Sequence, residues 1–567
     1  MLWSMPNAIQ TPPDWPSTIP VVQAQYKNWS WEIKVSQLWT CTPKTAANVV
    51  TVCNWARDHG WQVRARGIMH GWSPLTVVEG TPPNSNIILV NTRYLNAMTF
   101  IPRTATSGPQ VKVGTGATME DLLTFLEQQA GGQGAAPGYS FPHTPAPGNL
   151  TVGGVLAINA HGTAVPSPAD SFDCSYGSLS NQILAITAVV TDPKSSDPNS
   201  YALRTFTRGE GEDAAFLTHL GRAFVIDATL QVIDNYNLRC QSYMDITSST
   251  LFAAPSSSSP VPPNSMIDFL NKSGRVEVIW FPFTDAPWLK VWTNAPQQPG
   301  GSRIVSGPYN YPFSDNLPDF VTDLFKWVTS TAPALTPTLG SMMVGITKAG
   351  LSASNANDLW GPSKDTLLYV KDTTLRVTAN GYAVHLKKSD VQQAVHDFTA
   401  KFTAMLAAYQ ADNLFPVNSP LEIRITSLDD PAKVAVPPGT TARSPVISAL
   451  SYDDTNRQNG WDVALWLDVL TLPGTAAAND FYEELETWVT QTFSGTRGRA
   501  VPEWSKGWAY TSQGAWQNQP YLAHIRDLFT ENRSADNTWA FETATLAKYD
   551  AHGLFTNAFL GQLFISA

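Results

Sequence analysis

The segment RARGIMHGWSPL, residues 64–75, places a histidine, His70, in a glycine-containing turn directly after an apolar run that is typical of a strand. A turn of this kind exposes backbone N–H groups, which suits an anion such as a phosphate. His70 carries the most reactive ring of the turn and needs a separate explanation. The simplest one is a loop histidine that only makes a hydrogen bond, and the same holds for His161 in NAHGT.

A carboxylate and a guanidinium occur two residues apart in LEIRIT, residues 421–426. If this segment is a strand, Glu422 and Arg424 point to the same face, because side chains alternate along a strand. The opposite face would carry apolar side chains, namely Leu421, Ile423 and Ile425. The pair is either a surface ion pair, which contributes little to stability, or a charged pair at a functional site.

Two further charged residues stand in apolar or aromatic surroundings. Glu277 interrupts the otherwise apolar run from Val276 to Phe283, so we expect partial burial and a raised pKa, which suits a proton shuttle. An edge strand with Glu277 facing water is the alternative. Lys506, in EWSKGW, is a cation between two tryptophans, for which a surface cation–π contact is the alternative.

The glycine-rich segments do not match the standard nucleotide-binding motifs, but they are compatible with the binding of a large flat ligand. GGQGAAPG, residues 131–138, nearly matches the dinucleotide fingerprint, but Pro137 stands where the third glycine belongs. Neither a P-loop nor a GxSxG elbow occurs, which argues against NTPases and serine hydrolases. In NLTVGGVLAINAHGT, residues 149–163, small residues would let the backbone approach a large flat ligand. An ordinary glycine turn before a buried helix remains the alternative.

Composition excludes several classes of function. The 567 residues carry a net charge of −10, which argues against a nucleic-acid partner, since phosphate binding calls for a basic face. The four cysteines are widely spaced, no CxxC occurs, and no histidine lies within five residues of another. We therefore expect no zinc site built from local ligand pairs and four buried thiols, with a single disulfide left open.

The sequence also bears on the compartment. Its first twenty residues lack the positive and apolar regions of a signal peptide, and no run approaches the roughly 18 apolar residues that span a bilayer. We expect a soluble protein. Charged residues make up only 14% of the chain, against about 25% in typical globular proteins, which favours a secreted or periplasmic protein.

The elements that must position these residues fall into two groups. Residues 38–160 alternate strand and helix signals. One helix is expected after a Thr42 or Thr45 cap with a stop at Gly60, and another after Thr118 with a capping box to Asp121. Strands are expected at residues 62–66, 86–92, 183–192 and 223–233. This describes an α+β or α/β domain.

The pattern of predicted strands and helices changes after Cys240. PSSSSPVPP, residues 255–263, is expected to be a stiff polar loop outside any core. Strands are expected at 275–283, 375–386, 421–426 and 462–470, with a helix at 390–410. The pattern predicts a second domain with an antiparallel sheet covered by helices.

Several segments occur in the order and spacing of the FAD-binding domain of vanillyl-alcohol oxidase type flavoproteins: VRARGIMHGWS, VKVGTGATMEDLL, NLTVGGVLAINAHGT and YGSLSNQILAITAVVTD. Others resemble the bacterial type II cholesterol oxidases, which carry covalent FAD: LWTCTPKTAANVV, IWFPFTDAPWLKVWT, YNYPFSDNLPD, LYVKDTTLRVTANGYAV, LEIRIT, WLDVLTLPGT and PEWSKGWAYT. The resemblance covers nearly the whole chain. So many segments in one order are more specific than any single motif.

The resemblance implies an α+β, two-domain vanillyl-alcohol oxidase type fold. Residues 1–240 would form the FAD-binding domain, 241–480 a substrate-binding cap domain, and 481–567 would return to the FAD-binding domain. His70 matches the histidine bonded to the flavin 8α-methyl group, a bond that would raise the flavin's potential and prevent its loss. The remaining residues expected to hold FAD are Arg66, Gly67, Ile68, Met69, Gly71, Gly116, Thr151, Gly153, Gly154, Asn159, His161 and Gly162.

The implied reaction is oxidation of a 3β-hydroxysterol such as cholesterol. Hydride passes from C3 to flavin N5, O₂ is reduced to H₂O₂, and the 5-ene ketone is isomerised to the conjugated 4-ene-3-one, which needs a carboxylate and a cation. Arg424 would steady the substrate oxygen, and Glu422 would pair with it and gate access to the flavin. Glu277 would shuttle the proton and Lys506 would lie near the flavin or the oxygen. Asp462 stands where the family is expected to carry a neutral amide.

Three other interpretations remain open at the level of sequence. The first is an oxidase of sugars or other alcohols on the same fold, and the second is a steroid-binding protein that has lost catalysis. The third is a flavin dehydrogenase that passes electrons to a protein. The partners expected are a sterol and O₂, with transient contact with a membrane for sterol extraction, no metal ion, and a monomeric chain.

Overall fold

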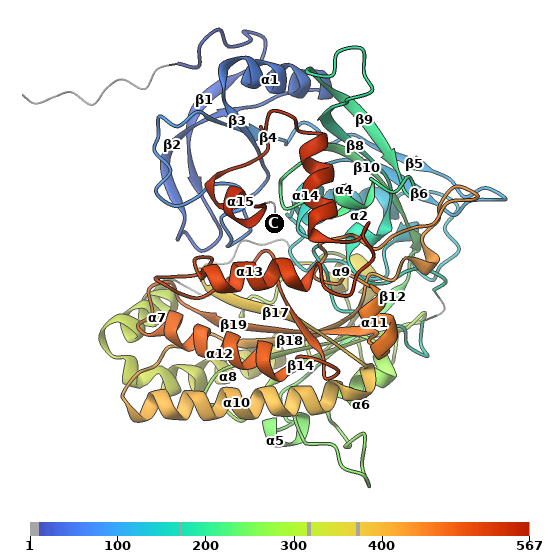
Figure 1. Ribbon diagram of the computed structural model, residues 1–567. Coiled ribbons are helices and arrows are strands. Elements are labelled where there is room, and N and C mark those ends of the chain that lie inside the picture. The colour runs from blue at the N-terminus through green and yellow to red at the C-terminus, as the bar shows by residue number, and fades with distance from the viewer. Residues whose placement is uncertain (1–10, 171, 314–318, 370–374, 566–567) are drawn as a thin grey trace, which may run out of the picture.

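The computed structural model describes residues 11–170, 172–313, 319–369 and 375–565, without the side chains of residues 319–322. Two parts are visible in Figure 1. The upper part carries the strands of the first 235 residues and the last helices of the chain. The lower part is built on one large sheet.

The upper part contains two main sheets. A four-stranded sheet has the order β1-β2-β4-β3, in which β3 and β4 are parallel. A five-stranded antiparallel sheet has the order β5-β6-β10-β8-β9. The bounds are Val21–Lys27 (β1), Lys34–Cys41 (β2), Gln62–Arg66 (β3), Ile87–Asn91 (β4), Met98–Ile101 (β5), Gln110–Gly114 (β6), Ile183–Thr191 (β8), Tyr201–Thr207 (β9) and Phe224–Gln231 (β10).

The two helix starts predicted in this part are confirmed. Helix α1, Ala46–His59, begins after Thr45, whose side chain accepts a hydrogen bond from the backbone of Asn48, and it ends at Gly60 in the left-handed region. Helix α2, Met119–Glu127, begins with the capping box between Thr118 and Asp121. Short helix α3, Val152–Ala157, follows Thr151.

The lower part is a nine-stranded sheet in the order β15-β16-β12-β14-β13-β18-β19-β17-β20, antiparallel except for the β15–β16 pair. It confirms the antiparallel sheet predicted for the second domain. The bounds are Asn237–Tyr243 (β12), Val276–Trp280 (β13), Trp288–Asn294 (β14), Arg303–Ile304 (β15), Asp358–Pro362 (β16), Thr378–Leu386 (β17), Leu421–Ser427 (β18), Val463–Thr471 (β19) and Arg499–Pro502 (β20).

Helices cover one face of the large sheet. Helices α6 (Met266–Ser273) and α10 (Val391–Ala411) lie below it in Figure 1, and α12 (Ala478–Thr492) packs beside α10. Leu421, Ile423 and Ile425 are fully buried in the core that these helices share with the sheet. Alternation along β18 therefore turns Glu422 and Arg424 to the other face, toward the upper part. Helices α7 (Asp319–Thr331) and α8 (Thr336–Ala353) lie at one end of the sheet.

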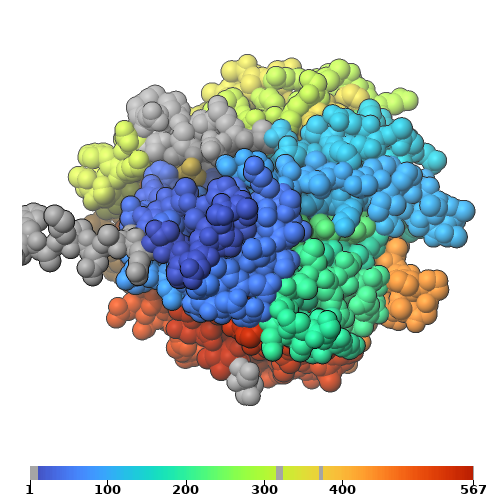
Figure 2. Space-filling view, turned by 90° about the horizontal axis from the view of Figure 1, so that it is seen from above, coloured from blue at the N-terminus to red at the C-terminus, as the bar shows by residue number. Residues whose placement is uncertain are grey.

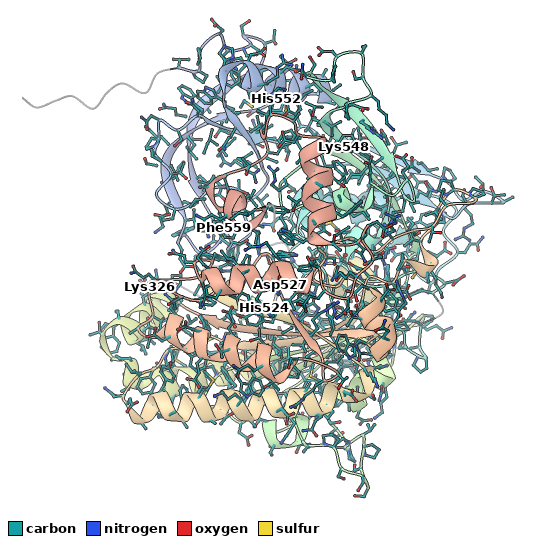
Figure 3. All side chains as sticks on the ribbon, viewed as in Figure 1. Lys326, His524, Asp527, Lys548, His552 and Phe559 are labelled. Atoms are coloured by element: carbon teal, nitrogen blue, oxygen red, sulfur yellow. The ribbon has the colours of Figure 1, made fainter. Side chains whose placement is uncertain are left out.

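The end of the chain joins the two parts. After α12 the chain adds β20 beside β17, then forms α13 (Gln519–Leu528), α14 (Trp539–Lys548) and α15 (Ala558–Leu563). Helix α13 lies between the large sheet and the upper part, and Phe559 and His552 mark the segment that returns to the upper part in Figure 3. Leu554 accepts a hydrogen bond from Val63 of β3. Viewed from above, the first part of the chain faces the reader in Figure 2.

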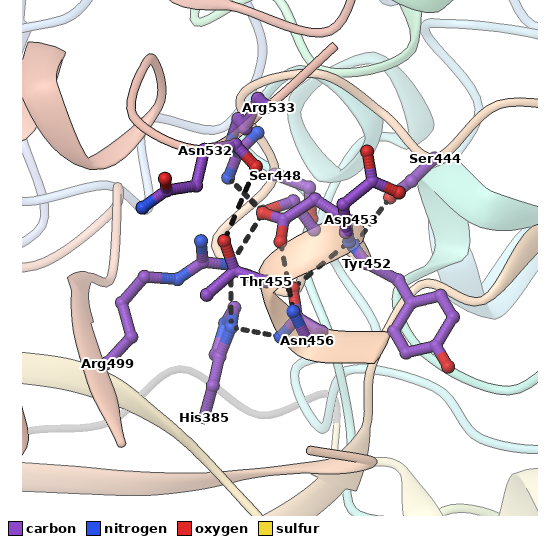
Figure 4. A network of polar contacts seen from close by, with 12 residues as sticks. His385, Ser444, Ser448, Tyr452, Asp453, Thr455, Asn456, Arg499, Asn532 and Arg533 are labelled. Atoms are coloured by element: carbon purple, nitrogen blue, oxygen red, sulfur yellow. Dashed lines mark hydrogen bonds and ion pairs between the residues drawn. The ribbon is translucent and has the colours of Figure 1, made fainter. Parts of the chain in front are cut away.

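A buried polar network fastens this closing segment to the sheet (Figure 4). A ring nitrogen of His385 on β17 lies 3.0 Å from the side-chain amide nitrogen of Asn456. The carboxylate of Asp453 forms ion pairs with the guanidinium groups of Arg499 at 2.8 Å and Arg533 at 2.9 Å. Burial and then the Arg499 charge lower the pKa of His385 to about 3. The imidazole is therefore neutral and serves as a hydrogen-bonding partner in the core.

Other predictions about the chain can be checked directly. The four cysteines are buried and unpaired, as expected, and the Pro/Ser loop at 255–263 lies mostly on the surface. Within the described ranges, no three His, Cys, Asp or Glu side chains are grouped so that they could bind a metal ion. Among the described residues, no helix has the length and apolarity needed to cross a bilayer.

Candidate active site

One cavity of about 460 Å³ runs between the two parts of the protein. Its upper wall comes from the turn at residues 66–71, the segment from Thr144 to Thr163, and residues 219–225. Its lower wall comes from the face of the large sheet that is turned toward the upper part and from the loop that carries Lys506. The cavity thus brings together segments more than 400 residues apart in the sequence.

The turn after β3 is pressed against the start of α3. A Cβ atom on Gly67 would lie 2.3 Å from Thr151 Oγ1, so only glycine fits between turn and helix. Met69, two residues on, has a positive φ of 60°. The resulting tight turn directs its backbone into the cavity, as expected for a segment that wraps a phosphate-containing ligand.

Most of the residues predicted to hold FAD line this cavity. They are Arg66, Gly67, Ile68, Met69, His70, Gly71, Thr151, Gly153, Gly154, Asn159, His161 and Gly162. Gly116 does not, and this prediction needs correction. A Cβ atom on Gly116 would lie 1.9 Å from the carbonyl oxygen of Thr92. Gly116 is therefore required for close packing behind the wall, where its backbone N–H bonds to Leu95.

His70 faces the cavity with an unused nitrogen. Its ring stacks on Trp29 at 3.8 Å between centroids, and its buried Nδ1 atom has no hydrogen-bond partner in the described part of the chain. Burial, followed by the charges of Lys506 and Arg376, lowers the pKa of His70 to about 3. The ring is therefore neutral, and within the described residues no protein group competes with a ligand for Nδ1.

Backbone hydrogen bonds fix His70 relative to Lys506. Trp72 and Ser73 both donate their N–H groups to the carbonyl of Ser505, at 2.8 and 3.3 Å. The ammonium of Lys506 lies 4.4 Å from the ring centroid of Trp72. The predicted aromatic setting of Lys506 is confirmed, but the ring beneath it is Trp72 rather than either neighbouring tryptophan, because Trp504 and Trp508 point into the core.

Lys506 retains its hydrogen-bonding capacity. Its nearest carboxylate oxygen, Asp468 Oδ2, is 4.0 Å away, which is beyond a hydrogen bond. Burial lowers the pKa of Lys506, but Asp468, Glu503 and Glu422 outweigh this and raise it above its usual value. The cavity wall therefore carries a charged ammonium with donors free for a ligand oxygen.

Arg424 is the centre of a charged cluster on the sheet. Its Nε donates to Glu277 Oε1 at 2.7 Å and its Nη1 to Asp468 Oδ2 at 2.8 Å, while Nη2 donates to Glu422. The cluster spans three adjacent strands, because Arg424 is opposite Glu277 on β13 and Glu422 is opposite Asp468 on β19. Glu422 and Arg424 share a face as predicted, and the face is a cavity wall rather than open surface.

The prediction for the pKa of Glu277 was wrong. Burial alone would raise it, but Lys290, which donates to Glu277 Oε2 at 3.0 Å, and Arg424 together lower the pKa to about 2. The sequence showed the apolar run around Glu277 but not the two cations that neighbouring strands bring to it. Glu277 is therefore an ionised carboxylate in the cavity wall.

The prediction for Asp462 also needs correction. Asp462 lies exposed just before β19, outside the cavity lining, and its Oδ1 accepts a hydrogen bond from the backbone of Lys388 at 2.8 Å. The carboxyl group on β19 that reaches the site is Asp468, six residues later. Strand pairing decides this, since Asp468 is in register with Glu422.

Sequence reasoning missed Asp468 and Glu503. Glu503 lines the cavity and lies near His161, whose Nε2 is 3.9 Å from Glu503 Oε1. Its place three residues before Lys506 was the one available signal. No sequence signal marked Asp468 as a site residue. An acidic residue in the apolar strand VALWLDVLT can be assigned a role only when its neighbours on other strands are known.

Comparisons with known proteins agree with this geometry. Residues 39–192 match the family model of an FAD binding domain, and residues 237–565 match that of the cholesterol oxidase substrate-binding domain. The chain belongs to the cholesterol oxidase family. Among curated proteins, none matches this chain.

Solved structures of the family extend over the whole chain. A solvent-stable cholesterol oxidase is 45% identical, with a TM-score of 0.91 over 98% of this chain and 100% of that one. The cholesterol oxidase from B. sterolicum is 38% identical with the same TM-score and coverage. A VAO-type flavoprotein from Myceliophthora thermophila C1, 13% identical with a TM-score of 0.51 over 91% of this chain and 78% of that one, shares the fold alone.

The cavity fits FAD as the family's cofactor. Its upper wall offers the tight turn at Gly67, which suits the pyrophosphate, and the unpartnered Nδ1 of His70. The lower wall has apolar side chains suited to a sterol and ends at the charged cluster around Arg424. The apolar residues are Ile279, Phe281, Phe325, Met343, Leu375, Val377 and Leu470.

Proposed function

We propose that this protein is an FAD-dependent oxidase that converts cholesterol and related 3β-hydroxysterols to the ketone and reduces O₂ to H₂O₂. One observation carries the proposal: a single cavity joins the turn at His70, in the FAD-binding part, to an apolar chamber closed by charged residues. An oxidase of sugars would need several converging polar groups along that chamber. The apolar side chains of the lower wall support a sterol.

His70 is proposed to hold the cofactor covalently through Nδ1. Three features support this role: the ring is neutral, its Nδ1 atom is buried, and Nδ1 has no partner within the described residues. Stacking on Trp29 fixes the plane of the ring. A covalent bond at this position would prevent loss of FAD and make its ring more electron-poor.

Bound FAD would supply the hydride acceptor for C3 of the sterol. The protein must orient that carbon, stabilise negative charge on the 3-oxygen and accept the hydroxyl proton. Lys506 is suited to bind the oxygen, because its ammonium faces the cavity with donors to spare. Arg424 is less free, since each of its nitrogens already donates to a carboxylate. We therefore assign Lys506 to the oxygen and Arg424 to holding Glu422 and Glu277 in place.

The isomerisation step is proposed for the same cavity. Moving a proton from C4 to C6 needs a base on the sterol face and a cation at the 3-oxygen. Glu277 is suited to be the base because it is ionised and lines the cavity. The Lys290 and Arg424 charges that keep it ionised also weaken it as a base, so we expect isomerisation to need sterol positioned directly against its carboxylate.

Sterol uptake is proposed to involve transient contact with a lipid bilayer. Helix α7 covers one end of the cavity, where Phe325 is 1% exposed and lines the wall, while Trp327 on its outer side is 49% exposed. Leu324 and Leu335 extend the exposed apolar side, and Lys326 marks this outer edge of the molecule in Figure 3. Aromatic and basic side chains of this kind suit the bilayer interface.

Anaerobic titration of the purified protein with cholesterol tests the main proposal. Bleaching of the flavin spectrum with formation of a conjugated enone supports both oxidation and isomerisation. A yellow protein that cholesterol fails to bleach, but another alcohol does, would refute the sterol assignment and keep the fold. Flotation with cholesterol-containing vesicles tests the membrane contact: Trp327→Ser should reduce binding, while Leu203→Ser, an exposed apolar residue on β9, should not.

A further inference from the structure

Two carboxyl groups beside the charged cluster, the buried Asp468 and the partly buried Glu503, each have a buried oxygen without a donor. Asp468 is fully buried. Its Oδ2 accepts a hydrogen bond from Arg424, but its Oδ1 has no hydrogen-bond partner. Glu503 Oε1 accepts from Ser505 at 3.1 Å, while its Oε2 has no partner. Both statements refer to the described part of the chain. A buried carboxylate oxygen without a donor is costly, and two such oxygens side by side are costlier still.

Gly381 shows how close the two oxygens are. It lies opposite Asp468 in the β17–β19 pair, and Glu503 donates its backbone N–H to Gly381 at 3.0 Å. A Cβ atom on Gly381 would lie 2.5 Å from Asp468 Oδ1 and 3.2 Å from Glu503 Oε2. Both unpartnered oxygens therefore border the same small space, which is open only because residue 381 has no side chain.

Besides His161, which lies 3.9 Å from Glu503, the cluster holds one more carboxyl group than it holds cations, so one added proton balances its charges. The cations are Arg424, Lys506 and Lys290, and the carboxyl groups are Glu277, Glu422, Asp468 and Glu503. Three cations thus meet four carboxyl groups in a buried wall. A net negative charge there would be poorly solvated, and one proton removes it.

We propose that Asp468 and Glu503 share one proton, held by Asp468, and that this proton keeps the wall behind Lys506 and Arg424 electrically neutral. Asp468 is a positioning residue, since it acts on the substrate through the two cations it contacts. The inference rests on the proposed oxidase function for its effect on rate, but the shared proton itself is a property of the resting protein.

The pKa shifts caused by the neighbouring charged groups agree with a proton held by Asp468. Burial and then the charge of Glu503 raise the pKa of Asp468 well above its usual value. Burial would also raise the pKa of Glu503, but Lys506 and His161 lower it well below its usual range. The other facing groups are Glu422 and Arg424 on β18, Glu277 on β13 and Lys290 on β14, and β17 contributes only Gly381.

The pH dependence follows from the sign of these shifts. The pair keeps its proton below the raised pKa of Asp468 and releases it to solvent as the pH rises through that pKa. The wall then carries a net negative charge beside the ammonium of Lys506. Negative charge on the substrate 3-oxygen becomes less favourable, so sterol oxidation should slow on the alkaline side with a one-proton dependence.

Asp468→Asn tests the proposal because it keeps the shape of the side chain and removes the titratable group. The amide can donate to Glu503 and accept from Arg424, so we expect sterol oxidation near neutral pH to stay within about tenfold of wild type and the alkaline loss of rate to disappear. Asp462→Asn, an exposed carboxyl group six residues earlier, should leave the pH profile unchanged. Superimposable profiles for Asp468→Asn and wild type would overturn the proposal.

Infrared spectroscopy of the resting protein gives a second readout that needs no sterol. Glu486 and Glu542 are also buried carboxyl groups with raised pKa values, so the readout is the difference between each variant and wild type in the carbonyl band of protonated carboxyl groups. Asp468→Asn and Glu503→Gln should each lose one component of this band, since either change removes one half of the pair, and Asp462→Asn should lose none. A band that is unchanged in both Asp468→Asn and Glu503→Gln would refute the shared proton even if cholesterol is oxidised. Conversely, loss of the component in both variants would support the pair even if the substrate proves to be another alcohol.

Discussion

Replacing Lys506 with methionine tests the assignment of the sterol oxygen to its ammonium. The change keeps an unbranched stem of similar length over Trp72 and removes the charge and its donors. Lys506 makes no hydrogen bond to the described residues, and its nearest carboxylate oxygen, Asp468 Oδ2, is 4.0 Å away, so the change breaks no hydrogen bond to a carboxylate. The variant should therefore fold and bind FAD, and its defect should be confined to the chemical step.

The expected magnitude follows from distance and dielectric. A unit charge at hydrogen-bond distance, about 3 Å, from a developing oxyanion is worth about 5 kcal/mol at an effective dielectric constant of about 20. The carboxylates of Glu422 and Glu503 offset part of this, since they also interact with Lys506. Removal of one oxyanion donor typically costs about 2.7–4 kcal/mol, so we expect flavin reduction to slow by about 100- to 1000-fold.

Stopped-flow reduction of the flavin by cholesterol under anaerobic conditions measures this step directly. The sterol dissociation constant should change little, because the ammonium binds charge that develops during the reaction. Lys433→Met, at an exposed lysine paired with Asp173, is the matched control and should reduce at the wild-type rate. A Lys506→Met rate within about threefold of wild type would refute the assignment and move the oxygen to Arg424.

Three further changes test other parts of the site. His70→Ala should still bind FAD, but acid precipitation should release the flavin into the supernatant; flavin retained in the pellet would place the covalent bond elsewhere. Glu277→Gln should release more unconjugated ketone while flavin reduction persists, and product analysis showing loss of both steps together would contradict this division of roles. Gly381→Ala should lower the free energy of unfolding by about 1–3 kcal/mol, because its Cβ would lie 2.5 Å from Asp468. Urea titration against Gly345→Ala, a helical glycine with no atom within 4 Å of its Cβ, checks this value.

The sequence by itself determined the family, the α+β class and most of the elements. Helix caps at Thr45 and Thr118 are local signals, because a side chain there bonds to a backbone group three residues away. The alternation in LEIRIT placed Glu422 and Arg424 on one face for the same local reason. The turn at His70 was likewise predicted from the residues that form it.

Only the tertiary structure decided the electrostatics of the site. From the sequence, Glu277 is predicted to be a buried carboxyl group with a raised pKa. In the folded sheet, β14 and β18 place Lys290 and Arg424 beside it, and these two charges lower its pKa instead. The sequence gives no sign that Asp468 is functional, because only the strand register places it opposite Glu422. Asp462 precedes β19 and lies outside the cavity. Alternation follows from neighbouring residues, whereas charge interactions depend on distances across strands, and these distances exist only once the sheet has formed.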